Sequence, residues 1–294
     1  MSTTPAARTL FARWIDDAAV FPPDCLPMAQ AWHEHRGHLL SGYGDLLGPL
    51  LVGASGATSL VDVAAAAHDR EAEEPRAVAV GVIARPGTPV EDLVAAVSLL
   101  RASAHVRVAS VEVAHDDDGR WTRALELGVP VAVEVPRETD AREPALDAVA
   151  EAATAGGPGL TVKLRTQSTP VAPVPTVAEV TALMVGARDR GLPFKLTGGL
   201  HRAVAHTAAL PDGSTEDQHG ALNVLVATHH LEEGATREVL EEVLALRDGD
   251  LLATAARSLD GAQAAAVRTR FVSFGCCGVT DPISDLAALG LLPA

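Results

Sequence analysis

The sequence predicts an α/β fold, a (β/α)8 TIM-like barrel with an N-terminal helical extension and an irregular C-terminal third. The main observation is a repeated unit, in which a short apolar segment is followed by an alanine-rich segment with helical spacing. Strands that alternate with helices in this way run parallel, because each helix returns the chain to the edge where the strand began. The six clear strand candidates are residues 49–55, 77–85, 108–115, 130–136, 160–166 and 193–199.

The composition supports the same fold class. Hydrophobic residues make up 48% of the 294 residues, yet aromatic residues make up only 3%, so the core consists mainly of Ala, Val and Leu. Such a core suits helices packed on buried parallel strands better than a β-sandwich. We find no linker or low-complexity segment, and therefore predict a single domain over residues 1–294. Residues 1–48 form its helical extension and cover one end.

Helix boundaries carry recognisable signals. Thr176 precedes an apolar segment and is followed three residues later by Glu179, which is the pattern of a capping box. Gly128 and Gly191 follow helical segments at the position where a C-terminal glycine is expected. Residues 119–128 are predicted to form one of these helices.

The C-terminal third departs from the regular repeat. Residues 219–231 predict a helix, residues 249–259 suit a strand or a helix, and residues 270–277 predict a last strand followed by a helix over 281–292. An irregular seventh strand would complete the eight. A doubly wound open sheet is the alternative, but no glycine-rich G-x-G-x-x-G loop follows the first strand.

Charge and cysteine content exclude several classes of function. The formal net charge of −15 argues against a nucleic-acid or anionic-membrane surface. Three cysteines are too few, and odd in number, for a disulfide framework. Charged residues interrupt the first twenty positions, so we expect neither a signal peptide nor a membrane span, and we predict a cytoplasmic protein. Its predicted partner is a small anionic or carbonyl molecule. The sequence is compatible with both a monomer and a homo-oligomer.

Charged side chains occupy one face of four consecutive strand candidates. Because side chains alternate along a strand, one face meets the apolar helices and the other faces the barrel interior. The charged residues lie toward the carboxyl ends of the strands, where barrel enzymes hold their active sites. The alternative is a salt-bridge network that only fills the barrel, although such networks stabilise weakly. The inward residues are Glu112, Glu134, Lys163 with Arg165, and Lys195 with Thr197.

Only two of the 23 basic residues are lysines, namely Lys163 and Lys195. They occupy matching positions of consecutive strand candidates. Lysine can lose its proton and act as a nucleophile or base, whereas arginine remains charged. Two lysines retained at these positions therefore indicate a chemical role for the amines.

The two lysine segments resemble the paired strands of the class I deoxyribose-phosphate aldolases. The segments are T-V-K-L-R-T at 161–166 and F-K-L-T-G-G-L at 194–200, and the resemblance covers about residues 108–200. It implies that Lys163 forms a Schiff base and that Lys195, within a K-x-[ST]-G-G pattern, favours the neutral form of Lys163. It also implies a small-residue loop formed by Thr197, Gly198 and Gly199.

This chain departs from the aldolase pattern at several positions. The family's S-T-G after the first lysine is here Arg165-Thr166-Gln167, and no phosphate-binding loop is recognisable after Gly199. Glu134 stands in for the catalytic aspartate of the family. Because the planar guanidinium of Arg165 suits a bidentate grip on a carboxylate, we expect a small oxo-acid or aldehyde substrate that Glu112 also contacts.

Histidines gather between residues 198 and 230. His201 directly follows the sixth strand candidate, where we expect it to transfer protons. His219 and Asn223 share one helix face and are expected to contact substrate. Cys277, between glycines at the end of the last strand, is a further candidate contact, although a small buried thiol is the commoner explanation.

Taken together, these residues predict a carbon–carbon lyase that acts through a lysine Schiff base and needs neither a metal nor another cofactor. Its catalytic residues are Lys163, Lys195, Glu134 and His201. A metal-dependent barrel hydrolase or isomerase, using His201, His219 and a strand glutamate, is one alternative. A barrel that binds a small anion without catalysis is another.

Overall fold

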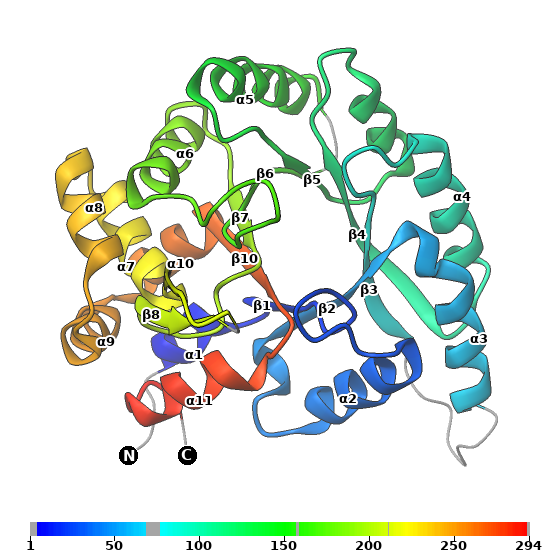
Figure 1. Ribbon diagram of the computed structural model, residues 1–294, viewed down its shortest axis with the longest axis horizontal. Coiled ribbons are helices and arrows are strands. Elements are labelled where there is room, and N and C mark those ends of the chain that lie inside the picture. Colours follow the sequence, from blue (N-terminus) through cyan, green and yellow to red (C-terminus); the bar gives the residue numbers. More distant parts are fainter. Residues whose placement is uncertain (1–4, 69–76, 157–158, 211, 293–294) are drawn as a thin grey trace. The chain divides into compact units, whose positions relative to one another are not determined.

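The computed structural model describes residues 5–68, 77–156, 159–210 and 212–292. Within these residues, eight strands close into a barrel in the order β1-β10-β7-β6-β5-β4-β3-β2, which confirms the predicted (β/α)8 fold (Figure 1). The barrel strands are β1 (Ile15–Asp17), β2 (Leu47–Gly53), β3 (Val78–Ile83), β4 (Val106–Ala114), β5 (Val131–Glu134), β6 (Leu160–Arg165), β7 (Phe194–Thr197) and β10 (Phe271–Cys276).

Contacts along the chain divide it into two compact units. One consists of Asp16–Lys163, and the other combines Met1–Ile15 with Leu164–Ala294. The prediction that residues 1–294 form a single domain therefore stays a prediction.

The unit Asp16–Lys163 contains a continuous parallel ladder from β2 to the start of β6. Val52 pairs with Val82, and Val113 pairs with Val133. The valine side chains are fully or almost fully buried, because branched side chains pack well on a pleated surface. The helical elements of this unit are α2 (Met28–Leu40), η1 (Gly44–Leu46), η2 (Ala54–Gly56), α3 (Ala57–His68), α4 (Val90–Arg101), η3 (Arg120–Leu127) and α5 (Thr139–Thr154).

The amphipathic helices α3 and α4 pack side by side, and α4 lies on β3 and β4 (Figure 1). Leu93, Val97 and Leu100 of α4 are completely buried, at the spacing of one helix face. Residues 119–128, predicted as an α-helix, contain the 3-10 helix η3 instead, flanked by left-handed Gly119 and Gly128. A tight helix of eight residues still buries Trp121.

The other unit pairs β7 with β10 in parallel, with Lys195 opposite Ser273 and Thr197 opposite Gly275. Its helices are α1 (Pro5–Phe11), α6 (Val177–Asp189), α7 (Ala221–Glu232), α8 (Arg237–Ala245), α9 (Gly249–Ser258), α10 (Gly261–Arg270) and α11 (Thr280–Ala288). The capping box predicted at Thr176 and Glu179 is present at the start of α6. Gly191 has the left-handed conformation expected after that helix.

Two expectations about the barrel strands need correction. The segment expected to be a helical extension supplies β1 (Ile15–Asp17), and the described residues between β7 and β10 contribute no barrel strand. They form instead an antiparallel hairpin, β8 (His206–Ala209) with β9 (Thr215–Gln218), and the helices α7 to α10. The segment that suited a strand or a helix is the helix α9. In Figure 1, α8 and α9 lie beside α7.

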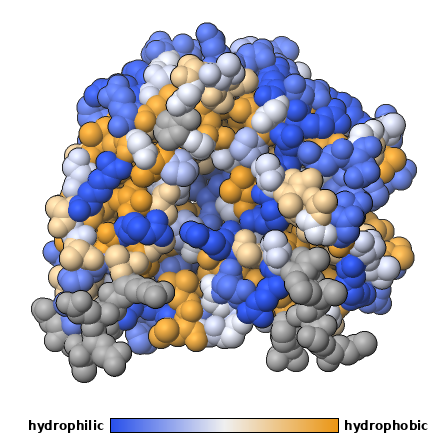
Figure 2. All heavy atoms as spheres, turned by 180° about the vertical axis from the view of Figure 1, so that it is seen from behind, coloured by the Kyte–Doolittle hydropathy of each residue, from blue (hydrophilic) through white to orange (hydrophobic). Residues whose placement is uncertain are grey.

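Surface residues are mixed in polarity. Figure 2 shows hydrophilic and apolar residues interspersed over the face that it presents. Large exposed apolar side chains, such as Leu40 and Val171, occur in several separate elements of the chain. Among the described residues, no helix has both the length and the hydropathy that crossing a lipid bilayer requires.

Candidate functional site

A buried lysine lies between two glutamates on neighbouring strands of the unit Asp16–Lys163. The Nζ atom of Lys163 lies 2.7 Å from Oε2 of Glu112 and 2.8 Å from Oε2 of Glu134. The side chains of Lys163 and Glu112 are 3% and 1% exposed, whereas that of Glu134 is 16% exposed. Glu134 is therefore the carboxylate through which solvent reaches the cluster.

Strand register explains why these three side chains meet. Glu134 is the Cα partner of Lys163 between β5 and β6, so both side chains leave the sheet on the same side. Glu112 lies between the buried Val111 and Val113 and is thereby directed away from the apolar face. The sequence pattern predicted these inward directions. The structure adds that both carboxylates bond the same ammonium group.

Burial makes the pairing in this cluster essential. An unpaired charge in a protein interior costs several kcal/mol, so each group needs the opposite charges beside it. Two carboxylates and one ammonium carry a formal charge of −1 together. Glu134, as the more exposed of the two carboxylates, is the one that can exchange a proton with solvent.

Lys195 belongs to the other unit, where it is 5% exposed on β7 beside Ser273 of β10. The predicted nearness of the Lys163 and Lys195 amines stays a prediction. Arg165, at the end of β6, is partly exposed. Its predicted grip on an anionic group likewise stays a prediction.

The small-residue loop after β7 is built for close backbone contact. Gly198 and Gly199 have φ values of +74° and +71°. A Cβ atom at Gly199 would lie 2.7 Å from the carbonyl oxygen of Thr166, so a side chain at this position would collide with backbone. The amide of Thr166 donates to Thr197 at 2.8 Å, and that of Gly198 donates to Gly275 at 3.1 Å. The loop is thus held between the ends of β6 and β10.

His201 meets two cysteines at the ends of β7 and β10. Its Nε2 atom lies 3.7 Å from Sγ of Cys277, and its Nδ1 atom lies 3.8 Å from Sγ of Cys276. The cysteines are 1% and 8% exposed at positions 276 and 277, and His201 is partly exposed. The sequence singled out His201 and Cys277 separately but did not predict that they touch.

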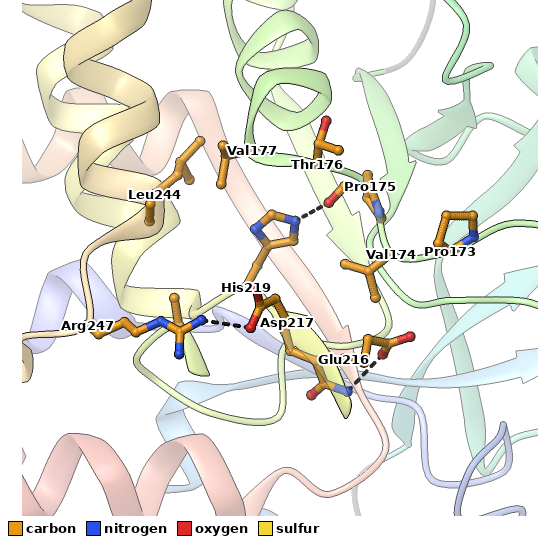
Figure 3. Close-up of a pocket in the computed structure, with 13 residues that line it drawn as sticks. Pro173, Val174, Pro175, Thr176, Val177, Glu216, Asp217, His219, Leu244 and Arg247 are labelled. Atoms are coloured by element: carbon orange, nitrogen blue, oxygen red, sulfur yellow. Dashed lines mark hydrogen bonds and ion pairs between the residues drawn. The ribbon is translucent and has the colours of Figure 1, made fainter. Parts of the chain in front are cut away.

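His219 lies in a pocket of about 510 Å³ (Figure 3). Its Nε2 atom lies 2.7 Å from the carbonyl oxygen of Pro175. A carbonyl only accepts, so Nε2 carries a proton and donates, and Nδ1 of the neutral ring is an acceptor. The ion pair between Arg247 and Asp217 lies at the same pocket (Figure 3). The pocket is lined by Pro173, Val174, Pro175, Thr176, Val177, Ala205, Glu216, Asp217, Gln218, His219, Leu244, Ala245 and Arg247.

Acidification is expected to destabilise the protein through His219. Burial lowers the pKa of His219, and the hydrogen bond to Pro175 opposes this shift only in part. The unfolded chain then binds a proton more readily than the folded chain, so the contribution of His219 to stability falls as pH drops below 6.5. Urea unfolding across this range should show the loss.

The variant His219→Gln isolates this contribution. Burial also lowers the pKa of His206 and of His230, and both residues remain in the variant. The free energy of unfolding of His219→Gln should therefore decline less on acidification than that of the wild type. Equal declines in the two proteins would contradict the assignment to His219.

Asn223 is completely buried, and its amide bonds the backbone of three other residues. The side-chain oxygen accepts from the amide of Ala205 at 2.8 Å. Its Nδ2 atom donates to the carbonyls of Val243 and Leu246 at 2.8 and 2.6 Å. This geometry supports a structural role in place of the expected contact with substrate.

Replacing Asn223 with Ala is expected to lower the free energy of unfolding by about 2–3 kcal/mol, since buried backbone groups lose their partners. Asn223→Asp keeps the shape but sets a carboxylate against the Val243 and Leu246 carbonyls. Urea unfolding should therefore find Asp no more stable than Ala at this position. Wild-type stability of the Asp variant would show that packing, and not hydrogen bonding, is what counts.

Two buried aspartates, Asp16 and Asp17, lie on β1 and were not among the predicted site residues. Asp17 accepts from the amide of Ala19 at 3.0 Å, and its Oδ2 atom lies 2.9 Å from Nδ1 of His35 on α2. Asp16 packs against Gly48, where a Cβ atom would overlap its carboxylate. A strand of three residues gives too short a pattern for their direction to be predicted.

Metal ligands do not gather in the described part of the chain. There, no group of three or more His, Cys, Asp or Glu residues is arranged to hold a metal ion. His219 uses one ring nitrogen on Pro175, and His201 lies against the two cysteine sulfurs. The alternative of a hydrolase or isomerase with a metal on these histidines therefore gains no support.

No protein-family model and no curated protein matches the sequence. Among solved structures, the chain is similar to a deoxyribose phosphate aldolase from Aeropyrum pernix, described as having a unique tetrameric structure. The TM-score is 0.51 and the identity 11%, over 96% of this chain and 93% of the aldolase. A 7,8-dihydropteroate synthase from Vibrio fischeri ES114 has a TM-score of 0.48 and 10% sequence identity, over 96% of this chain and 93% of the synthase. The predicted resemblance to the aldolase family holds at the level of the fold.

Proposed function

We propose that the protein is an aldolase-like enzyme, a carbon–carbon lyase in which Lys163 forms a Schiff base with a small carbonyl or oxo-acid substrate. The observation that carries the proposal is the buried lysine with a carboxylate on each side, at 2.7 and 2.8 Å. The barrel fold, shared with an aldolase, is consistent with this chemistry.

The cluster contains the groups that Schiff-base formation needs. Glu134, the carboxylate that solvent can reach, takes one proton from the Lys163 ammonium, and the freed amine attacks the carbonyl carbon. The surplus proton on the attacking nitrogen then passes to the alkoxide, which gives a carbinolamine. Loss of water, assisted by a proton from Glu134, gives the iminium ion. The iminium ion accepts the electrons of the Cα–Cβ bond as it breaks, while the β-hydroxyl gives its proton to Glu134 and its carbon leaves as a carbonyl product. The enamine left on Lys163 takes a proton at its α-carbon, and addition of water releases the second product and the amine.

The remaining predicted residues have supporting roles in this proposal. Glu112, which is almost fully buried, keeps a negative charge beside the iminium ion that Lys163 carries. Lys195 and Arg165 supply positive charge for an anionic substrate, and Arg165 can grip a carboxylate with two parallel hydrogen bonds. His201 is a second candidate for moving protons, and Thr197, Gly198 and Gly199 line the substrate site.

Borohydride trapping tests the proposal. The native protein is incubated with small aldehydes, ketones and 2-oxo acids, reduced with borohydride, and mapped by mass spectrometry. We expect a reduced adduct on Lys163. Lys163→Arg keeps the positive charge without a nucleophile and should give no adduct. Absence of an adduct from the wild type across the whole panel would overturn the proposal.

The same preparations separate the other functions. If the barrel only binds anions, the wild type should bind the oxo acids without forming an adduct. The Lys163→Arg variant should then bind them as tightly as the wild type does. A metal-dependent hydrolase should contain a stoichiometric metal by elemental analysis and lose its activity to a chelator. The proposed lyase should be unaffected by the chelator.

We also infer a cytoplasmic protein that works without nucleic acid or membrane, given the acidic net charge of −15. The aldolase from Aeropyrum pernix is described as tetrameric. We therefore also propose that this chain forms a homo-oligomer. Light scattering after gel filtration will measure the mass of the assembly.

A further inference from the structure

We propose that Cys277 is a second nucleophile of this protein, which reacts with small electrophilic carbon compounds after passing its proton to His201. A thiol reacts through its thiolate, and an adjacent imidazole is one of the groups that produce it. The inference does not use Lys163 and goes beyond the proposed function.

Strand pairing brings the two residues together. β7 and β10 run parallel, and Thr197 is the Cα partner of Gly275. The chain passes beyond both strands at the same edge, so His201 and Cys277 meet although 75 residues separate them in sequence. This edge holds the carboxyl ends of the strands, where barrel enzymes carry out their reactions.

The local contacts distinguish Cys277 from its neighbour. The thiol of Cys276 lies 3.4 Å from the carbonyl oxygen of Gly278 and donates to it, so its proton has an acceptor. Sγ of Cys277 lies 3.7 Å from Nε2 and 4.0 Å from Nδ1 of His201. Either ring nitrogen can take the proton, and Cys277 is also the less buried thiol, at 8% against 1%.

The chain that follows the pair leads directly into a helix. Cys277 lies three residues before the first residue of α11. At Gly278, a Cβ atom would lie 2.9 Å from Oδ2 of Asp281 and 3.8 Å from Nδ1 of His201. Both groups therefore lie close to the glycine that follows Cys277.

Iodoacetamide is the probe for this inference. The sulfur of Cys277 attacks the methylene carbon, a carbon–sulfur bond forms as the carbon–iodine bond breaks, iodide leaves, and the thiol proton remains on His201. Cys25, which is free and exposed, provides an ordinary thiol in the same molecule. No carbonyl substrate is added, so the result does not depend on Schiff-base formation at Lys163.

Short alkylation of the native protein at neutral pH, followed by peptide mapping, measures both rates. We expect Cys277 to react about tenfold faster than Cys25, and His201→Gln to slow Cys277 about tenfold without changing Cys25. A rate at Cys277 that exceeds the rate at Cys25 but does not respond to His201→Gln overturns the inference.

Thiolate absorbance in the ultraviolet provides a second reading, which does not depend on access of the reagent. In a Cys25→Ser background at neutral pH, the band should disappear in Cys277→Ser and in His201→Gln, and persist in Cys276→Ser. Slow alkylation of Cys277 together with absence of this band also overturns the inference. Slow alkylation with a band that requires His201 supports it.

Discussion

Lys163→Met is expected to lower the free energy of unfolding by about 3–5 kcal/mol, because it leaves two carboxylates without the charge that compensates them. Glu112 is the more costly of the two, since its side chain is 1% exposed and cannot gain water without opening the barrel. Urea unfolding at neutral pH should show a lower midpoint with an unchanged slope.

A second substitution separates charge from packing. Adding Glu112→Gln to Lys163→Met removes the buried negative charge, so the double variant should regain part of the lost stability. A double variant that is less stable than Lys163→Met would show that the cost lies in packing. If Lys163→Met unfolds with the same free energy as the wild type, the ion pairs of Lys163 with Glu112 and Glu134 are not present.

Trp14→Ala is expected to cost about 3–5 kcal/mol, as large aromatic truncations in a core do. Trp14 is completely buried, and its ring centroid lies 5.4 Å from that of Phe11 and 4.9 Å from that of Phe274. Its carbonyl also accepts from the amide of Phe274 at 2.9 Å. The chain before β1 is thereby packed into the core beside β10.

Two controls support this measurement by thermal or urea unfolding. Trp14→Phe keeps most of the aromatic contact with Phe11 and Phe274. It should therefore lower the free energy of unfolding by less than Trp14→Ala does. Leu40→Ala removes an apolar side chain that is 87% exposed, and should change the stability by no more than about 0.5 kcal/mol. A Trp14→Ala variant as stable as Leu40→Ala would show that the N-terminal segment only covers the barrel.

The sequence predicted those parts of the fold that consist of long periodic segments. Strands β3, β5, β6, β7 and β10 lie within the predicted apolar segments, because parallel strands buried on both faces are continuously apolar. Strands β2 and β4 overlap theirs but begin before them, at Leu47 and Val106. The start of α6 was predictable from Thr176 and Glu179, since a capping box is a local pattern.

Short and non-local features were not predictable. β1 has three residues, too few for periodicity to appear, and two of them are aspartates. Its place in the barrel depends on neighbours distant in sequence. The hairpin β8–β9 likewise contains polar residues such as Glu216 and Asp217, which give no strand pattern.

Within the candidate site, alternation along single strands was informative, and contacts between distant segments were not. The directions of Glu112, Glu134 and Lys163 followed from their buried neighbours. The contact of His201 with Cys277 depends on the register of β7 with β10, which no local pattern encodes. The expectation that His219 and Asn223 share a helix face is wrong, because α7 begins at Ala221 and His219 precedes it. Spacing also could not show that the Asn223 amide bonds the backbone of distant segments.

The hydrogen bonds of Asn223 and His219 set how the pocket in Figure 3 can widen. Asn223 fastens the segment before the hairpin to the end of α8, so these parts of the rim move together. The proline-rich rim at 173–177 is fastened to the opposite side through Pro175 and His219. The hydrogen bond between the His219 imidazole and the Pro175 carbonyl is therefore the contact that would have to break for this rim to separate from His219.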